Sequence, residues 1–107
     1  YIDDLAEALI FVANLNFDQF RNISLERCTH LNVGSGDEIS IKTLAELVSL
    51  TLGFKGMIDW DHAKPDGSPR KIMDSKVLRN LGWAPKISLE DGLKLTYEAF
   101  LSSNSRL

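Results

Sequence analysis

The side chains with the greatest potential for chemistry lie in one charged segment, residues 59–71, which reads Asp-Trp-Asp-His-Ala-Lys-Pro-Asp-Gly-Ser-Pro-Arg-Lys. It contains the cations Lys64, Arg70 and Lys71 and a central carboxylate, Asp66. Its two prolines restrict their own backbone and push the residue before each towards extended geometry. Asp66 and the glycine after it are a turn signal. We therefore expect a stiff loop that projects its charged side chains at fixed angles.

Such a loop suits a phosphorylated ligand that also carries ribose hydroxyls. Phosphate oxygens accept charge-assisted hydrogen bonds from Arg and Lys, and these are roughly twice as strong as neutral ones. An ionised Asp66 only accepts hydrogen bonds, so it could hold two neighbouring hydroxyls. The alternative is a solvated connector whose charges only maintain solubility.

The composition of the 107 residues is that of one small globular domain, with 44% hydrophobic and 25% charged residues. The net charge of -3 argues against general nucleic-acid binding. No apolar run approaches the length that crosses a bilayer, which predicts no contact with a membrane. The single cysteine, Cys28, excludes an internal disulfide and suits a reducing compartment. No pair of His, Cys or acidic residues has metal-ligand spacing.

Apolar periodicity and end signals predict four helices. They are expected to start at Asp3 or Asp4, at Ser40, at Asp74 or Ser75, and at Ser88. Their apolar positions continue to Ala13, Thr51, Leu81 and Leu101, respectively. Gly53 and Gly82 are expected to end the second and third helices. Residues 88–91 have the spacing of a capping box, and the tail from Ser102 is expected to fray.

The segments between the predicted helices have patterns that we interpret as strands and loops. Residues 30–33 alternate and run into Gly-Ser-Gly, which we interpret as a strand followed by a plain turn. Residues 54–60 are expected to form a second strand, and residues 70–73 a short extended segment. Residues 16–29 are predicted to be a connecting loop with at most a short helical turn. Mixed elements with short connections imply an α/β or α+β layer structure, in which Trp83 covers the core.

Four motifs together resemble the C-terminal half of the extended short-chain dehydrogenase/reductases. They are Tyr-Ile-Asp-Asp-Leu-Ala at 1–6, Leu-Asn-Val-Gly-Ser-Gly at 31–36, Lys-Pro-Asp-Gly-Ser-Pro-Arg-Lys at 64–71 and Leu-Gly-Trp at 81–83. The third motif discriminates within this superfamily. Its wording is similar to that of the GDP-L-fucose synthase family, whereas dehydratases and UDP-sugar epimerases usually show Arg-Pro-x-Glu or Arg-Pro-Gly-Asp. The resemblance runs from Tyr1 to about Leu101.

The resemblance implies an NADP-binding Rossmann domain outside this chain and a small mixed α/β domain, residues 1–107, that holds a GDP-sugar. Asp66 matches the acidic residue that contacts the nucleotide ribose. Arg70 and Lys71 match the basic end of the motif, which meets phosphate or substrate. Lys64 takes the place of the Arg in the related motif, although it lacks the planar fork of Arg.

The resemblance also implies where catalysis occurs. The Ser, Tyr and Lys of the reductase step, and the Cys and His of epimerisation, belong to the N-terminal domain. No catalytic or cofactor-binding residue is therefore expected here, and Cys28 and His30 are not that pair. The chain begins with Tyr1 in place of Met, so we expect a C-terminal piece of a larger protein.

Within this piece, residues 1–15 are expected to form a helix at the seam with the Rossmann domain, which involves Leu9 and Ile10. Residues 102–107 are expected to be a frayed tail. The resemblance further implies a cytoplasmic homodimer as the parent enzyme. Two alternatives stay open: another NAD(P)-dependent sugar-nucleotide epimerase or dehydratase, and a binding module without catalysis.

Overall fold

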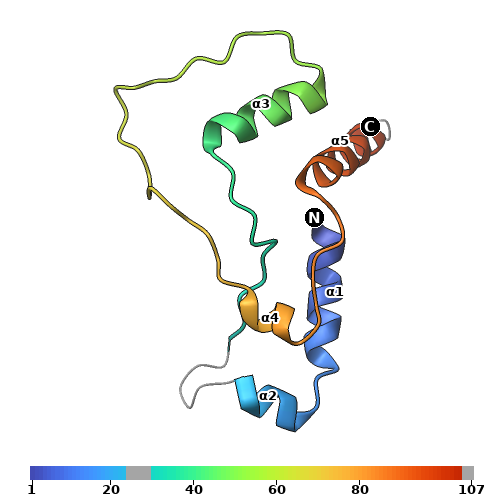
Figure 1. Cartoon of the computed structure of the whole chain (residues 1–107). Coiled ribbons are helices and arrows are strands. Elements are labelled where there is room, and N and C mark those ends of the chain that lie inside the picture. The colour runs from blue at the N-terminus through green and yellow to red at the C-terminus, as the bar shows by residue number, and fades with distance from the viewer. Residues whose placement is uncertain (24–29, 105–107) are drawn as a thin grey trace. The chain divides into compact units, whose positions relative to one another are not determined.

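A computed structural model of the chain describes residues 1–23 and 30–104. These residues form five helices (Figure 1): α1 (Ile2–Ala13), α2 (Phe17–Ile23), α3 (Ile41–Leu52), α4 (Lys76–Asn80) and α5 (Leu89–Asn104). None of the described helices is both long and apolar enough to cross a membrane. Cys28 lies outside the described residues.

Helix α1 confirms the predicted first helix but not the predicted cap. Tyr1 occupies the N-cap position and makes no side-chain capping bond. Asp4 is instead buried, with 6% of its surface exposed. Its two carboxylate oxygens accept hydrogen bonds, each 3.0 Å long, from the backbone N–H groups of Lys86 and Ile87. The expectation that Asp3 or Asp4 caps the helix was wrong, because Tyr1 occupies the N-cap position and the partners of Asp4 lie more than 80 residues further along the chain.

Helix α2 replaces much of the loop predicted for residues 16–29. Its start has the reciprocal bonds of a capping box. The Asn16 side chain accepts a hydrogen bond from the Gln19 amide at 2.8 Å, and the Gln19 side chain accepts one from the Asn16 amide at 3.1 Å. These two bonds satisfy amide groups that a helix start leaves without partners, so a seven-residue helix forms.

Helix α3 has the ends that the sequence predicts. The Ser40 hydroxyl accepts a hydrogen bond from the Thr43 amide at 3.0 Å, which is an N-cap bond. Gly53 ends the helix with φ of 66°, in the left-handed region that glycine adopts without a steric penalty.

The two C-terminal helices also lie where the sequence predicts them. Ser75 precedes α4, but its hydroxyl donates to the Gly34 carbonyl at 2.9 Å, while the Asp74 carboxylate accepts from the Lys76 amide. Ser88 caps α5 by accepting from the Asp91 amide at 3.1 Å. Helix α5 continues to Asn104, beyond the position where the tail was expected to fray.

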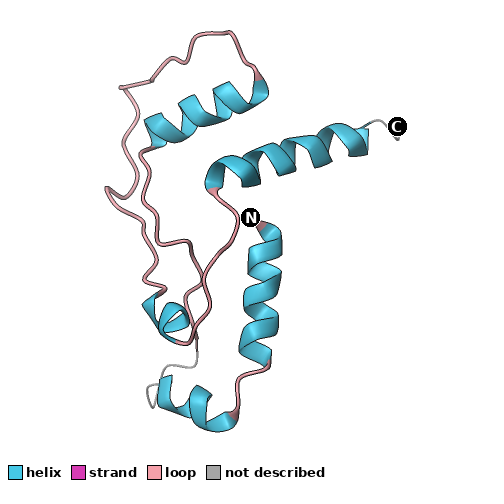
Figure 2. Ribbon diagram, turned by 45° about the vertical axis from the view of Figure 1, so that its right-hand side comes forward, coloured by secondary structure: helices cyan, strands magenta, loops and turns pink. Residues whose placement is uncertain are grey.

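The predicted strands are not present. The described residues contain no strand (Figure 2), and residues 30–33, 54–60 and 70–73 are irregular backbone. A strand requires a neighbouring segment that completes its backbone hydrogen bonds, and no described segment lies in register with these three. The mixed α/β class expected for the chain is therefore not confirmed, because alternation alone does not supply a pairing partner.

The chain divides into two compact units. The first comprises residues 1–37 and 72–87, and the second comprises residues 38–71 and 88–107. Ala8, Leu78 and Trp83 form the buried core of the first unit, and Phe11, Val12, Leu31 and Val33 pack against them. The prediction that Trp83 covers a core is confirmed, with 7% of its surface exposed. In the second unit, α3 contacts α5.

Candidate functional site

Two hydrogen bonds hold the backbone at the end of α3, where the charged loop begins. The backbone N–H of Phe54 donates to the Ser49 carbonyl at 2.9 Å, and the Ser49 hydroxyl donates to the Phe54 carbonyl at 3.2 Å. These two bonds hold the chain where it leaves the helix. All the residues from Lys55 to Asp74 are exposed, and none of them belongs to a helix or strand. Figure 1 shows this long segment between α3 and α4 in green to yellow.

The loop turns before the position that the sequence indicated. The Asp61 carboxylate accepts a hydrogen bond from the Ala63 amide at 3.0 Å, and the Asp61 carbonyl accepts one from the Lys64 amide at 3.2 Å. A side chain that bonds the amide two residues on forms an Asx turn. The turn predicted at Asp66-Gly67 is not present, and the turn that does form ends at Lys64, the residue before the first proline.

Arg70 is the predicted site residue with a defined partner. Its Nε and Nη2 groups donate to the two carboxylate oxygens of Glu38, and both distances are 2.8 Å. This is the bidentate geometry that gives an Arg–carboxylate pair its directional specificity. Both side chains remain partly in solvent, at 66% exposure for Arg70 and 50% for Glu38.

The pair shifts the pKa values of both groups so that each charged form is favoured. The hydrogen bonds from Arg70 lower the pKa of Glu38 below its ordinary value, with partial desolvation acting in the opposite direction. The hydrogen bonds to Glu38 raise the pKa of Arg70. Both groups are therefore charged throughout the neutral range.

The other three predicted site residues, Lys64, Asp66 and Lys71, are exposed. No ion pair joins any of them to another residue in the described part of the chain. The structure thus brings one predicted residue together with a carboxylate and leaves three charges available on the same loop. An arrangement of two ammonium groups, a guanidinium and a carboxylate on exposed backbone can bind phosphate and hydroxyl groups.

Sequence reasoning did not identify Glu38 as part of this site. Glu38 lies 32 positions before Arg70 and two before the cap of α3. No local pattern marks it, because its role depends on a contact between distant segments. The sequence offered one weak signal: Glu38 is an acidic residue close to the predicted cap Ser40, and the loop that follows the helix contains an Arg.

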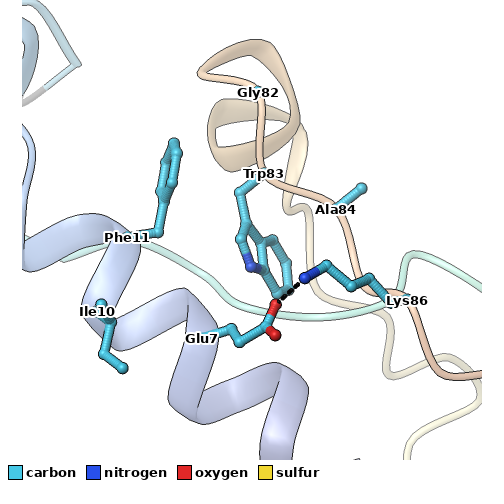
Figure 3. Close-up of a pocket in the computed structure, with 7 residues that line it drawn as sticks. All are labelled: Glu7, Ile10, Phe11, Gly82, Trp83, Ala84 and Lys86. Carbon is cyan, nitrogen blue, oxygen red and sulfur yellow. Dashed lines mark ion pairs between the residues drawn. The ribbon is translucent and has the colours of Figure 1, made fainter.

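A separate hollow lies in the first unit. It has a volume of about 370 Å³ and is lined by Glu7, Ile10, Phe11, Gly82, Trp83, Ala84 and Lys86. Figure 3 shows that the Glu7 carboxylate and the Lys86 ammonium, 2.6 Å apart, pair with each other across it. This ion pair raises the pKa of Lys86. Because the charged groups of Glu7 and Lys86 pair with one another, the rest of the side-chain lining is mostly apolar.

The Gly-Ser-Gly segment at 34–36 does not form a cofactor loop. Gly36 has φ of 78°, and the Arg79 guanidinium donates to the Ser35 carbonyl. The next helix, α3, begins only at Ile41. A dinucleotide loop needs a helix that starts directly after its glycines, with free amide groups that face the phosphates. The plain turn expected at residues 34–36 is not present, and the segment is irregular backbone that Arg79 contacts. The described residues contain no group of three His, Cys, Asp or Glu that could hold a metal ion.

Comparison with known proteins identifies relatives over nearly the whole chain. No family model matches it. Relatives named GDP-L-fucose synthase are 36 to 52% identical to this chain over the matched residues. GDP-L-fucose synthase 1 of Arabidopsis thaliana is 47% identical over 103 residues, which is 96% of this chain and 29% of the relative. This chain therefore spans less than a third of the length of that relative.

Solved structures of GDP-sugar reductases also match this chain over nearly its whole length. A GDP-6-OMe-4-keto-L-xylo-heptose reductase from Campylobacter jejuni has a TM-score of 0.82 and 34% identity, over 94% of this chain and 29% of the other. A GDP-mannoheptose C4 reductase from the same organism, with NADP bound, has a TM-score of 0.74 and 34% identity, over 92% of this chain and 29% of the other. The chain is therefore homologous to the C-terminal part of the GDP-L-fucose synthases and shares its fold with the matching part of GDP-sugar reductases.

Proposed function

We propose that this chain is the sugar-nucleotide-binding part of an NADP-dependent enzyme that converts GDP-4-keto-6-deoxy-D-mannose into GDP-L-fucose. The observation that carries the proposal is the 47% identity to a GDP-L-fucose synthase across 96% of the chain. The exposed charged loop, with the cations Lys64, Arg70 and Lys71 and the carboxylate of Asp66, supports it independently. Such a loop provides the donors and the acceptor that a nucleoside diphosphate requires.

Each charged residue of the loop has a distinct proposed role. Asp66 accepts hydrogen bonds from the two ribose hydroxyls of the GDP moiety. Arg70 and Lys71 donate to its phosphate oxygens. Lys64 adds a positive charge at the other end of the motif, as a point charge without the bidentate geometry of Arg.

The chemical steps are proposed to take place on a different part of the protein. Epimerisation next to the sugar carbonyl requires acid and base groups, and reduction requires hydride from NADPH. The described residues offer no cofactor loop, because Arg79 contacts the one Gly-x-Gly segment. The contribution of this chain is to hold the nucleotide half of the substrate, which positions the sugar for both reactions.

The surface of α1 supports the proposed seam with a second domain. Leu9 and Ile10 are 62% and 63% exposed, although both are large apolar residues on the same helix. A second domain at this surface would remove them from water. We further propose that segments 30–33 and 54–60 belong to a small mixed α/β domain in the whole enzyme, and that this enzyme is a cytoplasmic homodimer.

A second candidate function has specific support. Both solved structures described above carry names of GDP-heptose reductases, at 34% identity. The proposed nucleotide site would be the same for such a substrate, because GDP is common to both. Only the sugar and the residues that contact it would differ.

The decisive experiment is a titration of the full-length protein with GDP-fucose, a GDP-heptose and UDP-glucose by calorimetry, combined with an assay of NADPH oxidation in the presence of GDP-4-keto-6-deoxy-D-mannose. The proposal expects binding of GDP-fucose, no measurable binding of UDP-glucose, and NADPH oxidation by the full-length protein but not by residues 1–107. Preference for UDP-glucose would overturn it. Binding of GDP-fucose without NADPH oxidation would favour a binding module.

A further inference from the structure

The bidentate pair between Glu38 and Arg70 does more than neutralise two charges, because it also fixes the direction of the remaining Arg70 donors. An Arg side chain carries five N–H donors, and Glu38 accepts from two of them, Nε–H and one N–H of Nη2. Three donors therefore remain: both on Nη1 and the second on Nη2. These three lie on the edges of the guanidinium that the carboxylate does not cover, because the group is planar and its donors have fixed directions.

Glu38 lies immediately before a capped helix, whereas Arg70 lies within a long loop. Glu38 comes two residues before Ser40, whose hydroxyl accepts from the Thr43 amide at 3.0 Å and lies 2.7 Å from the Thr43 hydroxyl. Helix α3 follows directly, with 12 residues. Both residues lie on backbone without helix or strand, but Glu38 is three residues from α3, whereas Arg70 is six residues from α4. The contact thus links a long side chain in the loop to a residue that lies two positions before the N-cap of α3.

On the basis of this geometry we propose that Glu38 is the positioning residue for Arg70: it fixes the guanidinium in one orientation and thereby presents the three free N–H groups to a phosphate of the bound GDP-sugar. This inference rests on the proposed function, because it assumes that Arg70 contacts the diphosphate. The inference adds Glu38, which lies outside the motif at 64–71, to the proposed site. It also explains why that residue carries a carboxylate, which can bind a guanidinium through two oxygens. A fixed guanidinium loses less conformational entropy when the ligand binds than a freely rotating one.

Glu38 also has a second effect on GDP affinity, which is opposite in sign to its effect on the orientation of Arg70. A carboxylate near the site repels phosphate, so its removal by itself would strengthen binding. Asp37 is an exposed carboxylate on the adjacent residue, without an ion pair among the described residues. Asp37→Asn therefore measures the effect of removing one negative charge from this neighbourhood, separately from any effect on the orientation of Arg70.

The test is a double-mutant cycle on the affinity of the full-length protein for GDP, with Glu38→Ala, Arg70→Ala and the double variant, and with Asp37→Asn as the control. Calorimetry gives the affinities, and thermal denaturation confirms that each variant is folded. We expect Glu38→Ala to weaken GDP binding by about threefold to fivefold, in keeping with the modest coupling of exposed ion pairs. In the Arg70→Ala background Glu38→Ala should weaken binding no further, and any gain in affinity should match the gain measured for Asp37→Asn. Glu38→Gln, which retains one acceptor oxygen, should lie between wild type and Glu38→Ala.

The outcomes separate this inference from the proposed function. If Arg70→Ala weakens GDP binding while Glu38→Ala leaves it unchanged or strengthens it, the positioning role is wrong and the proposed function stands. The same conclusion follows if the effects of Glu38→Ala and Arg70→Ala are additive. If Arg70→Ala has no effect, or if GDP does not bind to the wild type, the assumed role of Arg70 in the proposed function fails, and the positioning role fails with it.

Discussion

The carboxylate of Asp4 accepts a hydrogen bond from the backbone N–H of Lys86 at 3.0 Å, across 82 positions of the sequence. Its second oxygen accepts one from the N–H of Ile87, also at 3.0 Å. Two amide groups that no helix or strand would satisfy thus find acceptors on one buried side chain. This carboxylate joins the start of α1 to the segment that leads into α5, and it stabilises the first unit.

Replacement of Asp4 by Asn should therefore destabilise the protein. An amide side chain has a single acceptor oxygen, so one of the two backbone N–H groups would face an NH₂ group and lose its partner. We expect the melting temperature to fall by about 5 °C or more. Asp3→Asn is the matched control, because Asp3 is exposed on the same helical turn. Equal melting temperatures for the two variants would contradict this role of Asp4.

The pH dependence of stability should contain a contribution from Asp4. The Lys86 and Ile87 amides lower the pKa of Asp4 below its ordinary value of 3.8, although burial acts in the opposite direction. A carboxyl with a lower pKa in the folded than in the unfolded protein stabilises the fold above the unfolded pKa, and this contribution is lost as the pH falls through the folded pKa. We expect Asp4 to contribute fully above about pH 5 and to lose its contribution below about pH 4. Urea denaturation at a series of pH values should show a shallower acid limb for Asp4→Asn than for wild type.

The core of the first unit supplies a second stability prediction. Leu78 on α4 is completely buried and packs in the cluster with Ala8 and Trp83. Leu78→Ala should lower the free energy of unfolding by about 2–5 kcal/mol, through lost burial and the cavity left behind. Leu50→Ala, at a position that is 80% exposed, should change it by less than about 0.5 kcal/mol. Chemical denaturation of the two variants measures the difference, and similar values would show that this cluster is not a core.

Local signals in the sequence were sufficient for most helix ends. Ser40 and Gly53 bound α3 as predicted, because the capping hydroxyl and the left-handed glycine act within a few residues of their own position. The same holds for Ser88 at the start of α5. Asn16 and Gln19 carried an equally local signal for α2, which the prediction of a loop overlooked.

Features that depend on distant partners could not be predicted in this way. The strands expected at 30–33 and 54–60 require pairing partners, and a hydrophobic pattern does not specify one. The roles of Asp4 and Glu38 depend on residues 82 and 32 positions away. The charged loop was predicted as a loop from its prolines, but the turn within it forms at Asp61, whose side chain accepts from the Ala63 amide, and not at Asp66-Gly67.

The proposed ribose contact of Asp66 leads to a prediction about affinity. Asp66→Ala removes the acceptor for both ribose hydroxyls, so the affinity of the full-length protein for GDP-fucose should fall by about tenfold or more, as expected when charge-assisted hydrogen bonds are lost. The affinity for the 2′,3′-dideoxy form of GDP should not change, because that ligand lacks the hydroxyls. Glu98→Gln, an exposed carboxylate on α5, is the control. A parallel loss of affinity for both ligands would assign Asp66 a structural role.

The proposed phosphate contacts of Arg70 and Lys71 predict a specific salt dependence. Attraction between exposed charges weakens as salt is added, because the screening length falls to about 8 Å at physiological ionic strength and to about 3 Å at 1 M. The affinity of the wild type for GDP should therefore decrease with salt, and the double variant with alanine at both positions should bind more weakly and with a flatter dependence. Lys55→Ala removes an exposed lysine from the same segment, without an ion pair among the described residues, and should leave the slope unchanged. If the double variant kept the wild-type slope, Arg70 and Lys71 would not contact the phosphates, and the basic loop would be the solvated connector that its exposure alone also allows.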